Sequence, residues 1–179
     1  PSRYSNRAIL YEDLGEENKA LIDYSKAIEL DPENATNWYY RGDFYYNYEH
    51  DKEALDDLEE ALKINPSYVD AINTIGLIYE EQGKIDLAIE TYERGITLEK
   101  TAPESAAYCY SNRAAIYAIQ EKFELALADY TKAIALDPEN PSRYSNRAIL
   151  YEDLGEENKA LIDYSKAIEL DPENATNWY

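Results

Sequence analysis

The sequence predicts an all-α protein in which helical hairpins repeat along the chain and stack into a solenoid. Two observations lead to this prediction. Apolar and small residues recur at helical spacing, and the tetrapeptide Asp-Pro-Glu-Asn returns at Asp31, Asp137 and Asp171, with a variant at Asn65. The spacing is 34 residues wherever nothing has been inserted. A period of this length is typical of helical repeat arrays.

Dividing the chain on this period gives five repeats and the start of a sixth. Their bounds are 1–34, 35–68, 69–106, 107–140 and 141–174, followed by the partial repeat 175–179. The third repeat departs most, because the stretch Thr101–Ser105 makes it four residues longer than the others and Lys100 replaces the proline. We expect residues 1–179 to form a single array.

Within each repeat the pattern predicts two helices joined by a turn. In the first repeat the periodic residues before Gly15 are Tyr4, Ala8 and Tyr11, and those after it are Ala20, Tyr24 and Ala27. The small residues let two helix backbones approach, while the tyrosines fill the space beside them. Because one hairpin buries too little apolar surface to fold alone, the hairpins are expected to stabilise one another by stacking.

Several columns of the aligned repeats resemble the tetratricopeptide repeat family. A tyrosine column holds Tyr11, Tyr45, Tyr79, Tyr117 and Tyr151, and an alanine column holds Ala20, Ala54, Ala88, Ala126 and Ala160. The family's aromatic, glycine and proline positions are matched as well. The resemblance implies a right-handed superhelix whose first helices line a concave groove, and a role in binding other proteins.

Residues 1–39 are identical to residues 141–179. The first and fourth repeats agree at only about half of their positions, so packing in one solenoid does not require identity. A recent duplication of a four-repeat block, an engineered concatemer, and a natural array of longer near-identical units all remain open. Exposed apolar faces at the two ends would allow head-to-tail association of chains.

The composition excludes several classes of partner. A net charge of −20 argues against nucleic acid and anionic membrane surfaces. No run of 18 apolar residues is present to span a membrane. The single cysteine, Cys109, excludes an internal disulfide and fits a reducing compartment, so we expect a cytoplasmic location and a basic or neutral partner.

Signals for catalysis are sparse. The single histidine, His50, lies in a predicted turn, and Cys109 has no second histidine to pair with. The acidic residues lack the spacing of a metal-binding loop, and no glycine-rich phosphate loop is present. We expect no enzyme, no cofactor and no metal, while an enzyme whose catalytic part lies outside these residues stays open.

Two charged columns predict ion pairs inside the hairpins. The first helices carry Arg7, Arg41, Arg113 and Arg147, and the second helices carry Asp23, Asp57, Asp129 and Asp163. The third repeat has Ile75 and Thr91 at the two places, so both partners are lost together. We expect structural ion pairs; the alternative is that the arginines bind a ligand.

The columns expected to line the groove contain acids and tyrosines but no lysine or arginine. The residues predicted to contact a peptide are Asn6, Tyr39, Tyr40, Asp43, Tyr46, Asn73, Tyr108 and Asn112, with Glu12, Glu80 and Glu81 steering a basic peptide. The segment Ser111–Ala114 also resembles the chaperone-binding subfamily, which binds the terminal carboxylate of a chaperone tail. That site needs lysine and arginine on the first helices of the flanking repeats, but here those places hold other residues, for example Asn73 and Leu77. An acidic chaperone tail is therefore rejected. The alternative is that these groove residues are simply solvated and bind no peptide.

Together these features predict a non-catalytic scaffold that binds a peptide segment of another protein. The alternative is a self-stacking structural or engineered array produced by duplication of the four-repeat block.

Overall fold

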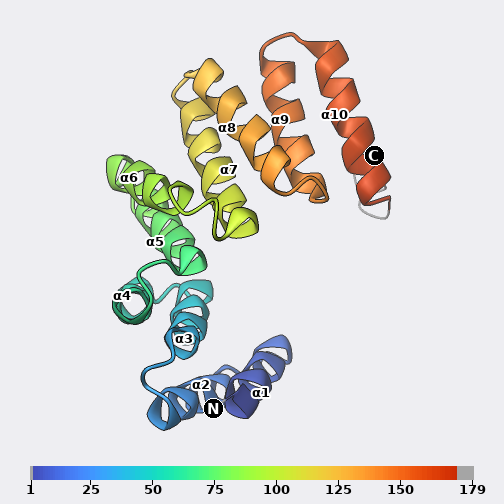
Figure 1. Cartoon of the computed structure of the whole chain (residues 1–179). Helices are drawn as coiled ribbons and strands as arrows, with labels where there is room; N and C mark the ends of the chain where they lie inside the picture. Colours follow the sequence, from blue (N-terminus) through green and yellow to red (C-terminus); the bar gives the residue numbers. More distant parts are fainter. Residues whose placement is uncertain (1, 173–179) are drawn as a thin grey trace. The chain divides into compact units, whose positions relative to one another are not determined.

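The computed structural model describes residues 2–172, and this part of the chain consists of α-helices joined by short turns (Figure 1). The ten helices of the described residues are α1 (Ser2–Asp13), α2 (Glu17–Leu30), α3 (Ala35–Asn47), α4 (Asp51–Ile64), α5 (Val69–Glu81), α6 (Ile85–Ile96), α7 (Pro103–Ile119), α8 (Phe123–Leu136), α9 (Pro141–Asp153) and α10 (Glu157–Leu170). Each predicted repeat therefore supplies two helices. The predicted start of a sixth repeat, 175–179, lies outside the described residues.

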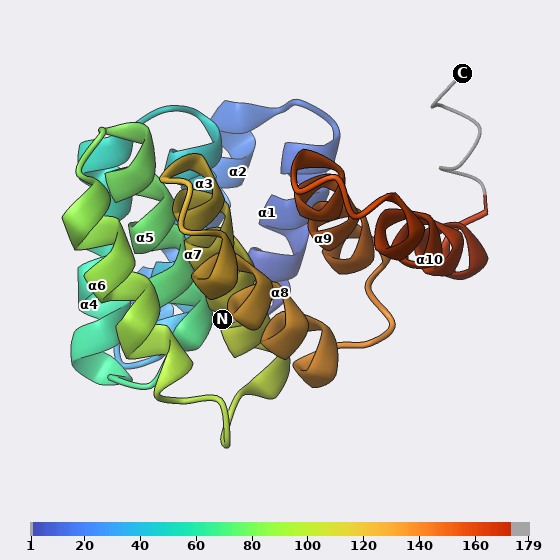
Figure 2. The same ribbon diagram turned by 90° about the horizontal axis from the view of Figure 1, so that it is seen from above.

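The chain divides into two compact units, residues 1–84 and residues 85–179. In the first unit α1 packs against α2 and α3 against α4, while α5 contacts both α3 and α4. In the second unit α7 packs against α8 and α9 against α10, and α8 and α9 lie side by side (Figures 1 and 2). Each unit thus shows hairpins that pack on the next hairpin in the chain.

Small residues hold the paired helices close together. Ala8 on α1 and Ala20 on α2 are fully buried, and so are Ala114 on α7 and Ala126 on α8. Around Ala8 and Ala20, the rings of Tyr24 and Phe44 complete the buried cluster. Apolar side chains of consecutive hairpins therefore share one core in each unit, as expected for repeats that stabilise one another.

The turn between the two helices of a hairpin has one conformation in all five repeats. Its key residue has a positive φ, which is 70° at Gly15, Gly83 and Gly155, 61° at Glu49 and 58° at Glu121. The next residue donates its backbone N–H to the carbonyl five residues before it, one residue beyond the usual helical partner, as in the bond of 2.8 Å from Glu16 N to Tyr11 O. This left-handed residue ends the first helix and turns the chain back.

The loops between hairpins are closed by side chains of the repeated Asp-Pro-Glu-Asn segment. The Asn34 side chain accepts from Thr36 N and caps α3, and the Asn140 side chain accepts from Ser142 N and caps α9. Pro141 occupies the first turn of α9, as its position after Asn140 predicted. The four extra residues of the third repeat fall before and within the start of α7, which has 17 residues where α9 has 13.

Within residues 2–172, none of the helices combines the length and the apolar character needed to cross a membrane.

Candidate functional site

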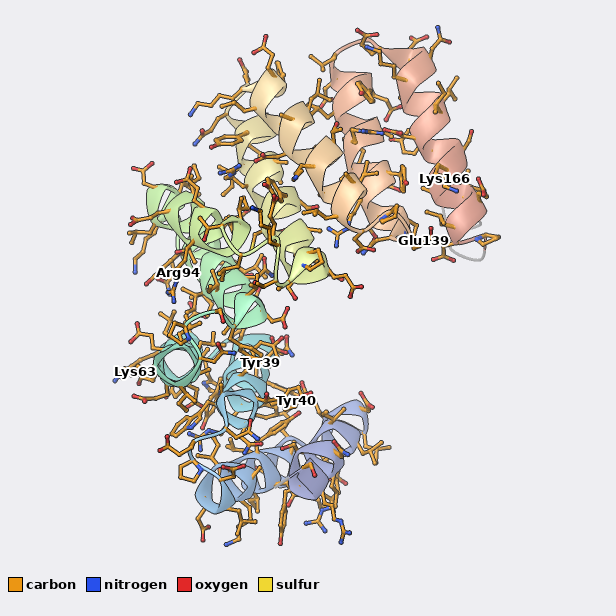
Figure 3. The ribbon with its side chains drawn as sticks, in the orientation of Figure 1. Tyr39, Tyr40, Lys63, Arg94, Glu139 and Lys166 are labelled. Atoms are coloured by element: carbon orange, nitrogen blue, oxygen red, sulfur yellow. The ribbon has the colours of Figure 1, made fainter. Side chains whose placement is uncertain are left out.

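In the first unit, the residues predicted to contact a peptide lie on three first helices: α1 carries Asn6 and Glu12, α3 carries the tyrosines and Asp43, and α5 carries Asn73, Glu80 and Glu81. Tyr39 and Tyr40 project from α3, and Lys63 lies on the opposite side of the unit, on α4 (Figure 3). The first helices therefore present a surface that differs in composition from the outer helix α4. We call the surface formed by these residues of α1, α3 and α5 the α1–α3–α5 surface.

Tyrosine rings form a continuous row that runs from the partly buried Tyr68, Tyr39 and Tyr40 to the buried Tyr24. The ring centroids of Tyr39 and Tyr68 are 5.0 Å apart in an edge-to-face arrangement. Tyr39 and Tyr40 are 5.7 Å apart, and Tyr40 lies 6.4 Å from Tyr24. Rings that pack on one another in this way lose little freedom when a ligand covers them, which makes them effective anchors.

Carboxylates stand beside these rings and accept hydrogen bonds from them. The Tyr24 hydroxyl donates to Glu12 Oε2 at 2.9 Å, and Asn47 Nδ2 donates to Glu12 Oε1 at 3.3 Å. The Tyr46 hydroxyl donates to Glu81 Oε1 at 2.7 Å. The bonds made by Asn47 and Tyr46 connect neighbouring repeats, and the three bonds together fix the positions of two carboxylates beside the aromatic row.

Asp43 is partly buried in the middle of the same surface. The Thr74 hydroxyl lies 3.5 Å from Asp43 Oδ1. Burial raises the pKa of the Asp43 carboxyl, and the nearby Glu12 carboxylate raises it further. The ionised form of a carboxyl group that is surrounded by apolar rings and other acids becomes more stable when a cation approaches.

The same environment acts on the tyrosines. Burial, and after it the Asp43 carboxylate, raises the pKa of Tyr39. Burial raises the pKa of Tyr68 to about 12. These phenols therefore stay neutral at physiological pH and contribute apolar area and hydrogen bonds.

The remaining predicted contacts are distributed as follows. Asn6 is exposed on α1, Asn73 and Glu80 are partly buried on α5, and Asn112 is partly buried on α7 of the second unit. Tyr108, also on α7, is half-exposed, and the Arg143 guanidinium lies 4.5 Å from its ring centroid. Tyr108 thus takes part in the packing of α9 on α7, a role that its column did not indicate.

The two charged columns meet inside the hairpins in the four repeats that carry them. Arg41 Nε lies 2.6 Å from Asp57 Oδ2, and a second nitrogen lies 2.9 Å from Oδ1. The same two-bond arrangement joins Arg7 to Asp23, Arg113 to Asp129 and Arg147 to Asp163. All four aspartates are buried, so each guanidinium neutralises a carboxylate that has left water.

Sequence reasoning missed a third contact of Arg41, Arg113 and Arg147. A further guanidinium nitrogen reaches the second helix of the preceding hairpin, where Arg41 donates to Ser25 Oγ at 3.1 Å and Arg147 to Thr131 Oγ1 at 3.0 Å. Arg113 approaches Glu93 at 3.4 Å. Ser25, Glu93 and Thr131 occupy the same position of their repeats, and each carries a side-chain oxygen. This shared property is the signal from which the contact could have been predicted.

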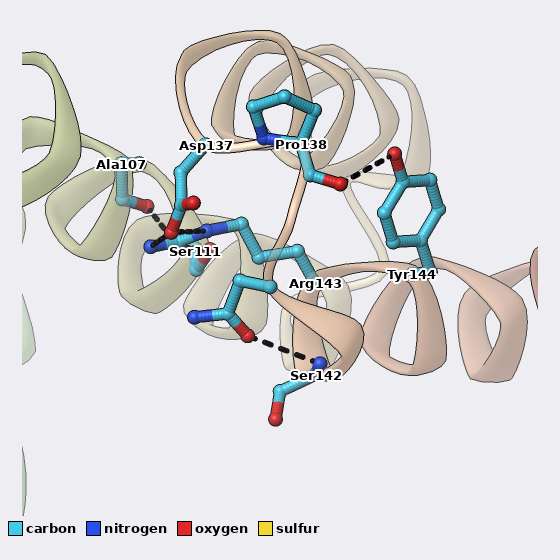
Figure 4. A network of polar contacts seen from close by, with 8 residues as sticks. Ala107, Ser111, Asp137, Pro138, Ser142, Arg143 and Tyr144 are labelled. Carbon is cyan, nitrogen blue, oxygen red and sulfur yellow. Dashed lines mark hydrogen bonds and ion pairs between the residues drawn. The ribbon is translucent and has the colours of Figure 1, made fainter. Parts of the chain in front are cut away.

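Sequence reasoning also missed a buried arginine at the contact of α9 with α7. Arg143 donates to Asp137 Oδ2 at 3.0 and 2.8 Å, to Ala107 O at 2.9 Å and to Ser111 Oγ at 3.0 Å (Figure 4). Only 2% of its surface is exposed. Asn37 has the same repeat position on α3, where it accepts from Ser5 Oγ and donates to Ala27 O. This position therefore joins a hairpin to the one before it.

The described residues contain no group of three or more histidine, cysteine, aspartate or glutamate side chains placed to hold a metal ion. Cys109 is a buried free thiol.

Comparison with known proteins adds the following matches. Models of the family described as tetratricopeptide repeat match residues 1–34, 107–140 and 141–174, residues 35–68, and residues 69–101. The co-chaperone DNJ1 of Cryptococcus neoformans, described as containing tetratricopeptide repeats and a J domain, is 29% identical over 135 residues, which cover 70% of this chain. The chain spans 11% and 26% of the length of the first two curated relatives that it matches.

Two solved structures are similar over most of the chain. PilF of Pseudomonas aeruginosa has a TM-score of 0.81 and 20% identity over 94% of this chain and 75% of that one. YrrB, described as a TPR protein with an unusual peptide-binding site, has a TM-score of 0.59 and 28% identity over 95% of this chain and 86% of that one. The likeness to PilF concerns the all-α helical repeat fold alone.

Proposed function

Because the chain belongs to the tetratricopeptide repeat family, whose repeats generally mediate protein–protein interaction, we propose that it is a non-catalytic scaffold and that its α1–α3–α5 surface binds a basic segment of a partner protein. Repeats of this family typically act without catalysing a reaction, so affinity and geometry are the properties that matter here.

The observation that carries this proposal is the combination of acids and packed tyrosines on one surface. Glu12, Asp43 and Glu81 stand beside the row of rings formed by Tyr39, Tyr40 and their neighbours, and the columns that form the surface contain no lysine or arginine. A Lys/Arg-rich segment would meet complementary charge at each of the three repeats that form this surface, while the aliphatic stems of its side chains could lie on the rings.

The electrostatic environment of Asp43 also favours a basic segment over an acidic one. Its raised pKa means that the ionised carboxylate is held at a cost in the unoccupied protein. A bound ammonium or guanidinium would offset that cost, whereas an acidic segment would increase it. The likeness to YrrB, which is described as having a peptide-binding site, supports a peptide as the type of ligand.

The proposal can be tested by fluorescence anisotropy with a labelled Lys/Arg-rich peptide and the whole chain. We expect saturable binding that weakens as salt is added, because the contributing charges are partly exposed and are screened. Asp43→Asn is expected to lower the affinity by about 1 kcal/mol, or roughly fivefold.

A matched control is Glu59→Gln, which removes the same charge from the exposed face of α4 in the same unit. Binding that is insensitive to salt, or a loss of affinity that is equal in Asp43→Asn and Glu59→Gln, would contradict the proposed site. A Glu-rich peptide of equal length should not bind.

A further inference from the structure

We propose that the face of α3 that carries Tyr39, Tyr40 and Asp43 is an arginine site, which takes the guanidinium group of one arginine of the partner segment in preference to the ammonium group of a lysine. This inference rests on the proposed function, because it names the side chain that the α1–α3–α5 surface selects. A comparison of arginine with lysine separates the two claims.

The second repeat departs from the other four repeats at all three positions of this face. Where α3 has Tyr39, the other first helices have serine or asparagine, and where it has Tyr40, they have threonine or asparagine. The position of Asp43 holds an apolar residue in the other repeats: Ile9, Leu77, Ala115 and Ile149. The three side chains lie within about one turn of α3 and therefore share one face of the helix. The repeat pattern does not require this group of residues, so we look for its reason in binding.

No basic side chain offsets the charge of Asp43, which is partly buried. Burial raises the pKa of the Asp43 carboxyl, and the carboxylates of Glu12 and Asp70 raise it further. Within residues 2–172, no lysine or arginine forms an ion pair with it. The Thr74 hydroxyl lies 3.5 Å from Asp43 Oδ1 but only 3.2 Å from the carbonyl oxygen of Asp70, and it has a single proton to donate. The carboxylate therefore has room for further donors.

The same chain shows repeatedly how an aspartate beside aromatic rings is neutralised. Arg41 donates to the two oxygens of Asp57 at 2.6 and 2.9 Å. Its guanidinium carbon lies 5.4 Å from the ring centroid of Trp38 and 5.9 Å from that of Tyr45. Further guanidinium groups that pair with an aspartate and lie near a tyrosine ring are those of Arg7, Arg113, Arg143 and Arg147. The α3 face has the carboxylate and the rings of such a site but lacks the guanidinium.

Lysine takes a different kind of partner in this chain. The four buried aspartates of the hairpins each pair with an arginine, whereas Lys26 and Lys63 pair with Glu29 and Glu60 on the outer faces of their own helices. The physical reason is that a guanidinium is planar and weakly hydrated, so it can donate two parallel bonds to one carboxylate and stack on a ring. A compact, strongly hydrated ammonium loses more when it enters a partly buried site.

In the bound state, the arginine would donate two hydrogen bonds to Asp43 and lie against the rings of Tyr39 and Tyr40. Both rings project from α3 (Figure 3), and their centroids are 5.7 Å apart. Other basic residues of the segment would meet carboxylates that have no such pair of rings from the same helix, such as Glu81 on α5. Those carboxylates attract lysine and arginine alike, so the selectivity resides on α3.

The test compares two labelled probes of equal length and charge, oligoarginine and oligolysine, by fluorescence anisotropy with the whole chain. We expect the parent to bind oligoarginine about tenfold more tightly than oligolysine. Asp43→Asn should reduce this ratio of affinities by about threefold or more, because the neutral amide no longer accepts a bidentate guanidinium as a charged pair. Tyr40→Thr, which installs the residue that α5 has at this position, should also reduce the ratio, because it removes a stacking surface.

Two controls separate selectivity from general attraction. Asp56→Asn, on the exposed face of α4, removes the same charge and should leave both affinities as in the parent. Glu81→Gln removes a charge from the α1–α3–α5 surface and should weaken both probes by a similar factor, so that their ratio is kept. Circular dichroism verifies that each variant is folded.

The outcomes distinguish the arginine site from the proposed function. A parent that binds both probes equally well, or an Asp43→Asn variant that keeps the parent's ratio, would overturn the arginine site and leave the binding of basic segments intact. If neither probe binds, the proposed function is wrong and the arginine site falls with it.

Discussion

Asp43 illustrates how a single residue on the proposed binding surface affects both stability and affinity. Burial and the neighbouring Glu12 raise its pKa, so the folded protein holds the Asp43 proton more tightly than the unfolded chain does. At neutral pH the ionised carboxylate therefore lowers the free energy of unfolding, and this cost disappears as the pH falls through the raised pKa. The residue best placed to attract a cation is thus one that the folded protein maintains at a cost.

The first prediction follows from this sign. Asp43→Asn should raise the free energy of unfolding at neutral pH, and the difference from the parent should shrink as the pH is lowered into the acidic range. Urea denaturation at a series of pH values measures it. Asp56→Asn, on the exposed face of α4, removes an equal charge and serves as the control. A difference from the parent that grows on acidification would contradict the assignment.

The second prediction at the residue scale concerns the ion pairs inside the hairpins. Arg113 Nε lies 2.7 Å from Asp129 Oδ2, and both side chains are largely buried. Arg113→Leu and Asp129→Leu should each lower the free energy of unfolding by about 1–3 kcal/mol, because each leaves a charge without its partner. The loss of unfolding free energy in the double variant should be smaller than the sum of the two single losses, by at least about 1 kcal/mol.

The third repeat provides a natural reference for this double-mutant cycle. It carries Ile75 and Thr91 at the corresponding places, so the fold tolerates the loss of both charges together. The cycle is measured by denaturant unfolding of the four proteins. Strict additivity of the two single changes would mean that Arg113 and Asp129 do not act as a pair.

At the scale of the element, the turn inside each hairpin requires one left-handed residue. Three repeats use glycine, while Glu49 and Glu121 adopt φ values of 61° and 58°. Steric crowding makes this conformation unfavourable for a residue with a Cβ atom. In all five repeats the same backbone bond closes the turn, as between Lys122 N and Tyr117 O at 2.8 Å. Backbone geometry, rather than side-chain contact, therefore selects the residue.

The third prediction is that Glu49→Gly and Glu121→Gly stabilise the protein. Each should raise the free energy of unfolding by about 0.5–1 kcal/mol, since glycine adopts this φ without the steric penalty but loses more freedom on folding. Thermal and urea denaturation measure the change. Glu121→Ala removes the same charge but keeps the penalty, so it should not stabilise; an equal gain in both would show that charge is the cause.

Elements also differ in how well they could be predicted. Helix pairs, turn glycines and the capping role of Asn140 follow from local patterns, because each depends on residues within a few positions of one another. The role of Arg143 could not be read in this way. Its partners Ala107 and Ser111 come from the preceding hairpin, and the same position holds Arg3, Asn37, Ala71 and Cys109 in the other repeats, so no column of equal residues marked it.

At the scale of the whole molecule, stability is shared among neighbouring hairpins. Tyr24 of the first hairpin is buried against Phe44 of the second, with ring centroids 5.7 Å apart. Leu150 of the fifth hairpin is buried among residues of the fourth. Each hairpin therefore completes its core only when another hairpin is present.

The fourth prediction tests this dependence. A peptide of residues 107–140 alone should show little helix by circular dichroism, because it contains only the last 13 residues of α7 and the 14 residues of α8, and helices of this length are marginal in water without tertiary packing. The whole chain should be strongly helical and should unfold cooperatively. A peptide that is as helical as the same residues in the whole chain, with a cooperative melting transition, would contradict the idea that stacking supplies the stability.

The sequence by itself determined that the chain is an all-α array of helical hairpins with a period of 34 residues, because helix periodicity, turn residues and small-residue columns are local properties that five repeats express together. It also indicated which columns carry acids, tyrosines and paired charges. Only the tertiary structure decided what these side chains do. It shows that the Tyr108 ring supports Arg143 and that Asp43 is held among rings with a raised pKa. It also shows that Leu10 on α1 is exposed, although the identical position on α9, Leu150, is buried. The physical reason is that burial depends on which hairpin lies next to a residue, and two identical sequences with different neighbours have different environments.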